Sequence, residues 1–276
     1  MKIRDLINDS KLELNEAVLI LKYILNCDEM TIVANDQDEV SEEDLNRFKE
    51  AEAKVLDGYP LQYITNKQYF YENEFYVNEN VLIPQPDTEI LVQEVVDDII
   101  KSNFNKNDAI KILDLCTGSG AIAISVKEAC ENAGFNIEMY ASDISKDALE
   151  VAKFNCKSIL EDTNSIEFIK SDMFENINDL KFDYIISNPP YIKTDVIKTL
   201  DKDVQNEPNI ALDGGKDGLK FYKIIRENIF EYLNKNGKIF LEIGYDQKDE
   251  VSDLFKDFSV RCVKDFADND RVIIVK

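Results

Sequence analysis

A short stretch in the second half of the chain combines residue types that could hold a planar amide or amino group. Residues 182–186 form an apolar, β-rich run, and Asn188, Pro189, Pro190 and Tyr191 follow it. The Asn188 side-chain oxygen and the Pro189 carbonyl could accept from two N–H groups and stabilise the charge that develops when such a nitrogen is methylated. The prolines would keep the loop rigid, and the Tyr191 ring offers a flat surface. The alternative is a rigid turn that closes a strand, with Tyr191 capping the core.

A glycine-rich turn earlier in the chain, "DLCTGSGAIA" at residues 114–123, lies where a predicted strand meets a predicted helix. Gly118 and Gly120 allow the backbone to turn tightly and to approach a ligand closely. Asp143 ends the next predicted strand, where a carboxylate can accept both hydroxyl groups of a ribose. Asp143 could instead be a helix N-cap, because "SDISKDAL" also suits that role. Together, these features indicate a cofactor that contains a nucleoside.

Two classes of cofactor bind at turns of this kind: the nicotinamide or flavin dinucleotides, and S-adenosyl-L-methionine. A dinucleotide brings a pyrophosphate, which favours an uncluttered helix N-terminus. Asp114 lies on the strand side of the turn, where a carboxylate suits an ammonium or sulfonium group better than a pyrophosphate. The last two predicted strands are joined by "ADND", which is too short for a crossover, so they should be antiparallel. This tail resembles the seven-stranded sheet of class I methyltransferases and favours S-adenosyl-L-methionine.

The spacing of apolar residues divides the chain into a helical segment and an α/β domain. Residues 1–60 carry apolar residues at helical spacing and end at "GYP". Residues 61–85 are aromatic and extended, with "ENE" splitting a β-hairpin linker. Over residues 86–276, predicted strands alternate with helices, which indicates a mostly parallel sheet covered on both faces. The fourth strand should neighbour the first and bring Asn188 beside the glycine turn.

The composition excludes several kinds of chemistry and disfavours some partners. The 276 residues contain no histidine, which removes histidine-based acid–base catalysis, Ser-His-Asp triads and histidine-containing zinc sites, and we expect no metal site. The net charge is -23 without a strong basic cluster, so nucleic acid is a disfavoured partner. The five cysteines form no CxxC pair and fit buried thiols in a reducing cytosol. Neither a membrane span nor a signal peptide is indicated.

These motifs together are similar to those of the HemK/PrmC family, the glutamine-specific methyltransferases of peptide chain release factors. The resemblance covers nearly the whole chain and rests on "PLQYIT", "VLIPQPDTE", "ILDLCTGSGAIAISV", "SNPPYI", "EPNIALDGGKDGLKFY", "LEIGYDQ" and "DNDRVIIV". It implies an α/β class I S-adenosyl-L-methionine-dependent methyltransferase domain, with a Rossmann-like seven-stranded sheet and an antiparallel last strand, after a small all-helical domain. Two residues depart from the family pattern: Gln85 replaces the usual arginine, and Cys116 replaces the usual glycine.

The resemblance also implies roles for single residues. Residues 188–191 would hold the glutamine amide, and the turn from Thr117 to Gly120 would line the methionine portion of the cofactor. Asp143 would bind its ribose and Met173 its adenine, although the family often has an aromatic residue at the latter position. The residues expected at the cofactor are Asp114, Cys116, Thr117, Gly118, Ser119, Gly120, Asp143, Asp172, Met173 and Asn188.

The resemblance predicts a cytoplasmic, monomeric enzyme that methylates the side-chain amide nitrogen of the glutamine in the GGQ motif of class 1 peptide chain release factors. Residues 207–208 and 213–218 would form a loop near the mouth of its active site, although a glycine-rich turn explains the latter segment as well. The helical domain has no evident catalytic residue and is expected to hold the protein substrate. Two alternatives stay open: an amino-methyltransferase that acts on nucleic acid with the same NPPY sequence, and a non-catalytic binding module with a vestigial cofactor pocket.

Overall fold

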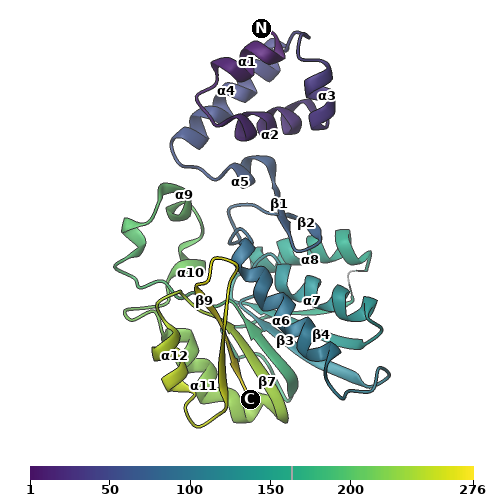
Figure 1. Ribbon diagram of the computed structural model, residues 1–276, viewed down its shortest axis with the longest axis vertical. Helices are drawn as coiled ribbons and strands as arrows, with labels where there is room; N and C mark the ends of the chain where they lie inside the picture. The colour runs from purple at the N-terminus through teal and green to yellow at the C-terminus, as the bar shows by residue number, and fades with distance from the viewer. Residues whose placement is uncertain (163) are drawn as a thin grey trace.

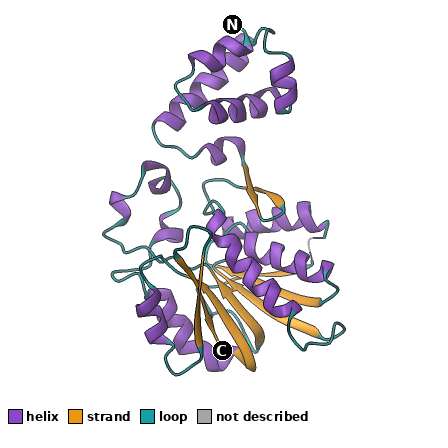
Figure 2. Cartoon of the chain, viewed as in Figure 1, coloured by secondary structure: helices purple, strands orange, loops and turns teal. Residues whose placement is uncertain are grey.

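The chain folds into a group of helices, then a hairpin, then a seven-stranded sheet flanked by helices (Figure 1 and Figure 2). The computed structural model describes residues 1–162 and 164–276. The helices are α1 Ile3–Asp9, α2 Leu14–Leu25, α3 Glu29–Ala34, α4 Glu42–Leu56, α5 Leu61–Thr65, η1 Pro86–Thr88, α6 Glu89–Ile100, α7 Ala121–Asn132, α8 Lys146–Leu160, η2 Ile197–Thr199, α9 Lys202–Gln205, α10 Asn209–Leu212, α11 Lys220–Tyr232 and α12 Lys248–Leu254. The strands are β1 Lys67–Phe70, β2 Asn73–Tyr76, β3 Ala109–Leu115, β4 Asn136–Asp143, β5 Ile166–Lys170, β6 Phe182–Ser187, β7 Leu233–Glu242, β8 Val260–Lys264 and β9 Asp270–Val275.

The first four helices have a hydrophobic core of their own, as the spacing of their apolar residues predicts. Ile20 and Leu21 from α2 and Phe48 from α4 are fully buried in it. The N-terminus of α4 is satisfied by the Ser41 hydroxyl, which accepts a hydrogen bond from the Asp44 N–H at 3.1 Å. This helical group lies beyond the end of the large sheet (Figure 1).

The linker between the helical group and the sheet differs from the prediction at its start. The expectation of extended chain from residue 61 is wrong, because α5 begins there. Pro60 immediately precedes α5, where the first N–H groups of a helix have no intrahelical partner and a proline costs little. Asn66 ends the helix in the left-handed conformation, with a φ of 56°. The predicted hairpin then follows as the antiparallel pair β1 and β2.

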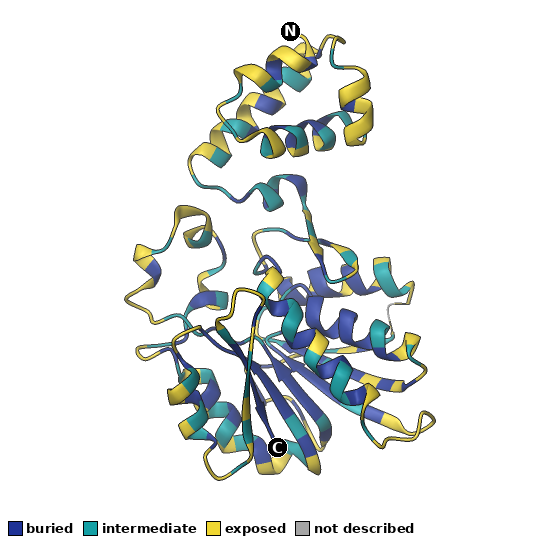
Figure 3. Cartoon of the chain, viewed as in Figure 1, coloured by how far each residue is buried: buried dark blue, intermediate teal, exposed yellow. Residues whose placement is uncertain are grey.

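The large sheet has the strand order β5-β4-β3-β6-β7-β9-β8, and β9 is antiparallel to both of its neighbours. The antiparallel closing strands and the pairing of β6 with β3 are therefore both confirmed. The apolar residues of α6, α7 and α8 pack on one face of the sheet, and those of α11 and α12 pack on the other. The inner strands β3, β6 and β9 are mostly buried, whereas the edge strands β5 and β8 are partly exposed (Figure 3).

The carboxyl ends of the parallel strands lie at the end of the sheet that faces the helical group (Figure 1). The long connection from β6 to α11 crosses this end and contains the short helices η2, α9 and α10, which the sequence pattern does not predict. It also contacts the end of the helical group: Lys202 forms an ion pair with Asp57 at 3.1 Å, and the Asn206 side chain donates to the Gly58 carbonyl at 3.0 Å. The domain boundaries at residues 60 and 85 stay predictions. No helix within the described ranges is long and apolar enough to cross a membrane.

Candidate active site

The glycine turn between β3 and α7 requires three residues in the left-handed region. Cys116, Gly118 and Gly120 have φ values of 60°, 56° and 82°. A Cβ on Gly120 would lie 3.1 Å from the Ala152 Cβ, so the turn and α8 can approach closely only because this residue is glycine. A Cβ on Gly118 would meet nothing within 4 Å, so the backbone of this residue borders open space. Cys116 adopts a conformation that favours glycine, at a cost in backbone strain.

Asp143 at the end of β4 fixes this turn through both of its carboxylate oxygens. Oδ2 accepts a hydrogen bond from the Gly118 N–H at 2.9 Å, and Oδ1 accepts one from the Ser145 N–H at 2.8 Å. Burial raises the pKa of Asp143, while these backbone donors favour the carboxylate. The residue that caps α8 is Ser145, which accepts from the Ala148 N–H at 3.1 Å, so the alternative of Asp143 as the helix N-cap is wrong. Each Asp143 oxygen keeps a lone pair that a hydroxyl group could reach.

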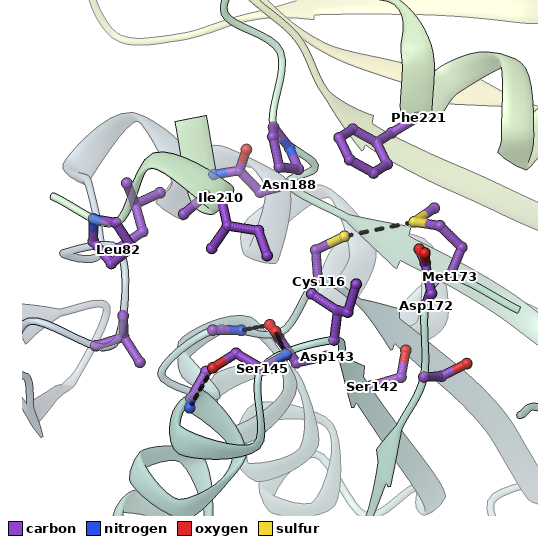
Figure 4. A pocket seen from close by; sticks show the side chains of 18 of the residues that line it. Leu82, Cys116, Ser142, Asp143, Ser145, Asp172, Met173, Asn188, Ile210 and Phe221 are labelled. Carbon is purple, nitrogen blue, oxygen red and sulfur yellow. Dashed lines mark hydrogen bonds between the residues drawn. The ribbon is translucent and has the colours of Figure 1, made fainter. Parts of the chain in front are cut away.

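A pocket opens beside the turn, and we call it the cofactor pocket (Figure 4). Seven of the residues predicted for the site line it: Cys116, Gly118, Asp143, Asp172, Met173, Asn188 and Pro190. The Cys116 sulfur lies 3.8 Å from the Met173 sulfur. The lining also includes apolar side chains that sequence reasoning missed, among them Leu82, Ile144, Ile210 and Phe221. Met173 stands at a position where the family often has an aromatic residue. Phe221 supplies an aromatic ring to the same pocket.

Four residues predicted for the cofactor do not line this pocket: Asp114, Thr117, Ser119 and Gly120. They are buried, and the Thr117 hydroxyl donates to Asp114 Oδ2 at 2.6 Å. The other Asp114 oxygen has no hydrogen-bond partner among the described residues, and burial raises the pKa of this carboxyl to about 7. Their geometry suits support of the turn, and direct contact with a cofactor stays a prediction for these four residues.

A second pocket adjoins the cofactor pocket, and we call it the amide pocket. It is lined by Asn188, Pro189 and Tyr191, three of the four residues predicted to hold the substrate. Asn188, Leu82 and Ala211 line both pockets. The remaining lining includes polar and charged side chains from distant segments of the chain: Gln85, Asp87, Glu207, Glu242 and Arg271. The NPPY segment therefore lies at the boundary between the two pockets.

Contacts from three other segments fix the NPPY loop. The Asn188 side-chain nitrogen donates to the Thr88 hydroxyl oxygen at 3.3 Å, which leaves the side-chain oxygen of Asn188 available as an acceptor. Gln247 donates to the Tyr191 carbonyl at 3.0 Å. The Gly214 N–H donates to the Ile192 carbonyl at 2.8 Å. Residues 213–218, predicted near the mouth of the site, thus pack directly against the loop.

Sequence reasoning missed Glu242 and Arg271, although both lie in motifs that carry the family resemblance. Glu242 is the last residue of β7, the strand next to β6, and an acidic residue that ends an apolar strand is a signal that could have found it. Gln85, the uncharged departure from the family pattern, donates to the Ile83 carbonyl at 3.0 Å. Within the two described ranges, no group of three or more histidine, cysteine or acidic residues could hold a metal ion.

The cofactor pocket fits the chemical groups of S-adenosyl-L-methionine. The Gly118 backbone borders open space, so the turn can approach a ligand without a side chain in the way. The carboxylate of Asp143 suits the two ribose hydroxyls, and the apolar side chains with Phe221 and Met173 suit an adenine ring. Residues 116, 118, 143, 173 and 221 would therefore hold the cofactor.

Comparison with known proteins agrees with the fold and the site. The profile of the methyltransferase small domain family matches residues 93–207. Two solved structures share the fold with a TM-score of 0.52 and 16% sequence identity: a methyltransferase from Pyrococcus furiosus, over 82% of this chain and 98% of that one, and human methyltransferase 10 domain containing protein, over 83% and 99%. The fold and the site define a class I S-adenosyl-L-methionine-dependent methyltransferase.

Sequence relatives identify the family within this class. The profile of the PrmC N-terminal domain matches residues 4–65. Release factor glutamine methyltransferase from Thermodesulfovibrio yellowstonii is 38% identical over 100% of this chain and 96% of the relative. Release factor glutamine methyltransferase from Bacillus subtilis is 37% identical over 95% and 90%. The chain belongs to the release factor glutamine methyltransferase family.

Proposed function

We propose that this protein transfers a methyl group from S-adenosyl-L-methionine to the side-chain amide nitrogen of the glutamine in the GGQ motif of class 1 peptide chain release factors. The observation that carries this proposal is the position of Asn188, which borders both the cofactor pocket and the amide pocket. A nitrogen held by this residue would lie at the boundary of the two pockets, where methyl transfer has to occur. Relatives that match 100% and 95% of this chain carry the name release factor glutamine methyltransferase.

The chemistry requires that an unreactive amide nitrogen be positioned and polarised. When bound, S-adenosyl-L-methionine supplies an electrophilic methyl group on a positively charged sulfur. The Asn188 side-chain oxygen and the Pro189 carbonyl would accept from the two N–H groups and favour the charge that develops on the nitrogen. The contact of Asn188 with Thr88 supports this role, because it commits the nitrogen of Asn188 elsewhere and fixes the orientation of its amide.

A protein substrate suits the charge of the chain better than a nucleic acid. The net charge is -23, and a polyanion would be repelled unless a basic patch offset this field. The GGQ motif also suits a narrow pocket, since side chains in place of the two glycines would obstruct entry of the glutamine. We assign the helical group to binding the release factor outside the pockets, and the cytosol as the location, because translation termination takes place there.

The test is methyl transfer to a purified class 1 release factor, with the modified glutamine located by mass spectrometry of its peptides. A DNA oligonucleotide and ribosomal RNA in the same reactions would compete for labelled methyl groups. We expect one methyl group on the GGQ glutamine and none on the nucleic acids. Label on nucleic acid without label on the release factor would support the rival amino-methyltransferase, and label on neither would support the non-catalytic binding module.

A further inference from the structure

A buried carboxylate lines the amide pocket, and the roles assigned so far do not use it. Glu242 at the end of β7 is 2% exposed. Its Oε1 accepts a hydrogen bond from the Tyr191 hydroxyl at 3.3 Å, whereas Oε2 has no hydrogen-bond partner among the described residues. Leaving a buried polar atom unpaired costs about 1–3 kcal/mol, so such an atom calls for an explanation.

Charged and titratable side chains face Glu242 from each element that packs against it. Asp87 belongs to η1, Tyr191 to the loop after β6, and Arg271 to β9, while the Tyr222 hydroxyl of α11 donates to the Glu242 backbone carbonyl at 2.8 Å. Burial raises the pKa of Glu242 to about 7. The Tyr191 hydroxyl and the Arg271 guanidinium favour its charged form, and Asp87 opposes it. The Thr88 hydroxyl also favours the charged form, although it makes no hydrogen bond of normal geometry to Oε2.

The positive charge of Arg271 is already shared between two other carboxylates. Its guanidinium lies 3.0 Å from Asp265 Oδ2 and 3.1 Å from Asp87 Oδ2. Arg271 therefore cannot act as a dedicated counter-ion that would lock Glu242 in its ionised form. Glu242 can take up or release a proton close to neutral pH.

Methylation of an amide nitrogen releases a proton, and the amide pocket must accept it. Three carboxylates line this pocket: Asp87, Glu207 and Glu242. Asp87 is bound to Arg271, and Glu207 accepts a hydrogen bond from the Ile83 N–H at 2.8 Å. Glu242 combines an unpaired oxygen with a direct contact to a residue of the NPPY loop.

We propose that Glu242 is the proton acceptor of the methyl transfer, reached through the hydroxyl of Tyr191. This inference rests on the proposed function. The lone pair of the amide nitrogen forms the bond to the methyl carbon, and the carbon–sulfur electron pair leaves with the sulfur. One N–H bond breaks with its electron pair retained by nitrogen, and its proton passes to the Tyr191 oxygen. The Tyr191 proton passes to the Glu242 carboxylate, so that positive sulfonium and negative carboxylate become a neutral thioether and a neutral carboxylic acid.

The first test is the pH dependence of turnover at saturating concentrations of release factor and S-adenosyl-L-methionine. In the wild type, kcat should rise with pH and level off above the Glu242 pKa of about 7, because the acceptor must be ionised. Glu242→Gln keeps the shape but accepts no proton. It should abolish this rise and lower the plateau by about 100-fold or more. Cofactor affinity measured by calorimetry should stay near the wild-type value.

Glu207→Gln is the matched control. Glu207 is also a buried carboxyl of the amide pocket, and burial raises its pKa to about 7 as well. Because Glu207 is bound to Ile83 rather than to the NPPY loop, this variant should keep the rise of kcat with pH. A rise that persists in Glu242→Gln, or that disappears in Glu207→Gln instead, would overturn the assignment.

A second measurement needs no turnover. Infrared difference spectra of wild type against Glu242→Gln should contain a protonated carboxyl band that disappears as pH rises through about 7. A Glu242 that is ionised at every pH would overturn the proposal. If Glu242→Gln does not fold, Tyr191→Phe removes the relay hydroxyl and keeps the ring, and it should lower kcat by about tenfold or more without raising KM. An unchanged kcat in that variant would also overturn it.

Failure of the two proposals can be told apart. A wild type that methylates no release factor would remove the proposed function and this inference together. A wild type that methylates the glutamine, with an unchanged pH profile in Glu242→Gln, would remove the inference alone.

Discussion

Replacing Gly214 by alanine should misplace the NPPY loop without changing the chemistry of any side chain in it. An added Cβ would lie 2.7 Å from the Tyr191 Cα and 2.8 Å from both the Pro190 oxygen and the Tyr191 carbonyl carbon. These are backbone atoms, and ordinary contact begins at 3.4 Å, so restoring ordinary contact requires the two segments to separate by about 0.6–0.7 Å. Misplacing reacting groups by about 1 Å can cost about 100-fold in rate.

We therefore expect Gly214→Ala to lower kcat on the release factor by about 10-fold to 100-fold. The affinity for S-adenosyl-L-methionine should change little, because the glycine turn follows β3 and Asp143 ends β4, and neither contacts Gly214. The assays are steady-state methyl transfer and calorimetric titration of the cofactor. Overpacking of this kind also costs about 1–3 kcal/mol of stability, so both assays should be run well below the melting temperature.

Gly237→Ala provides the matched control. Its Cβ would lie 2.8 Å from the Leu233 side chain and 3.0 Å from the Asp183 carbonyl, in the early part of β7 rather than at the NPPY loop. It should lower the melting temperature while leaving kcat near the wild-type value. The reasoning is refuted if Gly214→Ala turns over as fast as the wild type. It is equally refuted if Gly214→Ala loses as much cofactor affinity as turnover.

Four further predictions concern other residues of the candidate site and its buried carboxyl groups. Asp143→Ala should weaken cofactor binding by about 1–3 kcal/mol, since ribose hydroxyls lose a charged acceptor; unchanged affinity by calorimetry, with the fold intact, would mean that Asp143 only shapes the glycine turn. Asn188→Ala should lower kcat by about 100-fold or more with little change in cofactor affinity, and equal losses in both assays would contradict its role. Cys116→Gly should raise the free energy of unfolding by about 1 kcal/mol in urea titrations, because glycine adopts a φ of 60° without strain. A decrease would mean that the lost sulfur contact with Met173 outweighs the relief of backbone strain. Burial raises the pKa of Asp114 and Glu242 to about 7, above the value of about 4 in an unfolded chain, so the folded protein binds more protons between these two pH values. The melting temperature should therefore fall as the pH rises from about 4 to about 7 and level off above that. A melting temperature that rises over this range would show that these groups are ionised in the folded protein throughout.

Most of the sheet could be predicted from the sequence because its strands are continuous apolar runs between helices with clear start and stop residues. The antiparallel tail also followed from a local fact, the short "ADND" connection. The helix α5 was missed because its aromatic and β-branched residues resemble a strand. In the structure, Leu61 and Ile64 pack against the core of the helical group, and the Tyr63 hydroxyl donates to the Val81 carbonyl at 2.6 Å. The four-residue helices α9 and α10 are too short to carry a periodic signal.

The residues of the candidate site likewise divide into those that the sequence could predict and those that it could not. The NPPY segment and the glycine turn are linear motifs at strand ends, so the pairing of β6 with β3 was enough to bring them together. Glu242, Thr88 and Arg271 come from three other segments. The approach of Glu242 to Arg271 depends on the register of β7 against β9, and Thr88 comes from η1. Asp114 is a case that the structure leaves open. Its position beside the turn suggested contact with a ligand, the side chain is buried and accepts a hydrogen bond from Thr117, and direct contact with a cofactor stays a prediction.

The residues that line the amide pocket come from segments far apart in the sequence, from Leu82 before the sheet to Arg271 in β9. A nascent chain that still lacks its last strand would also lack Arg271, and β7 would lack the neighbour that covers its outer edge. Contacts of such high sequence separation form late in folding, because the entropy of closing long loops must be overcome first. Activity should therefore require a folded β9, and fragments that end before β9 should be inactive even where they hold both sequence motifs.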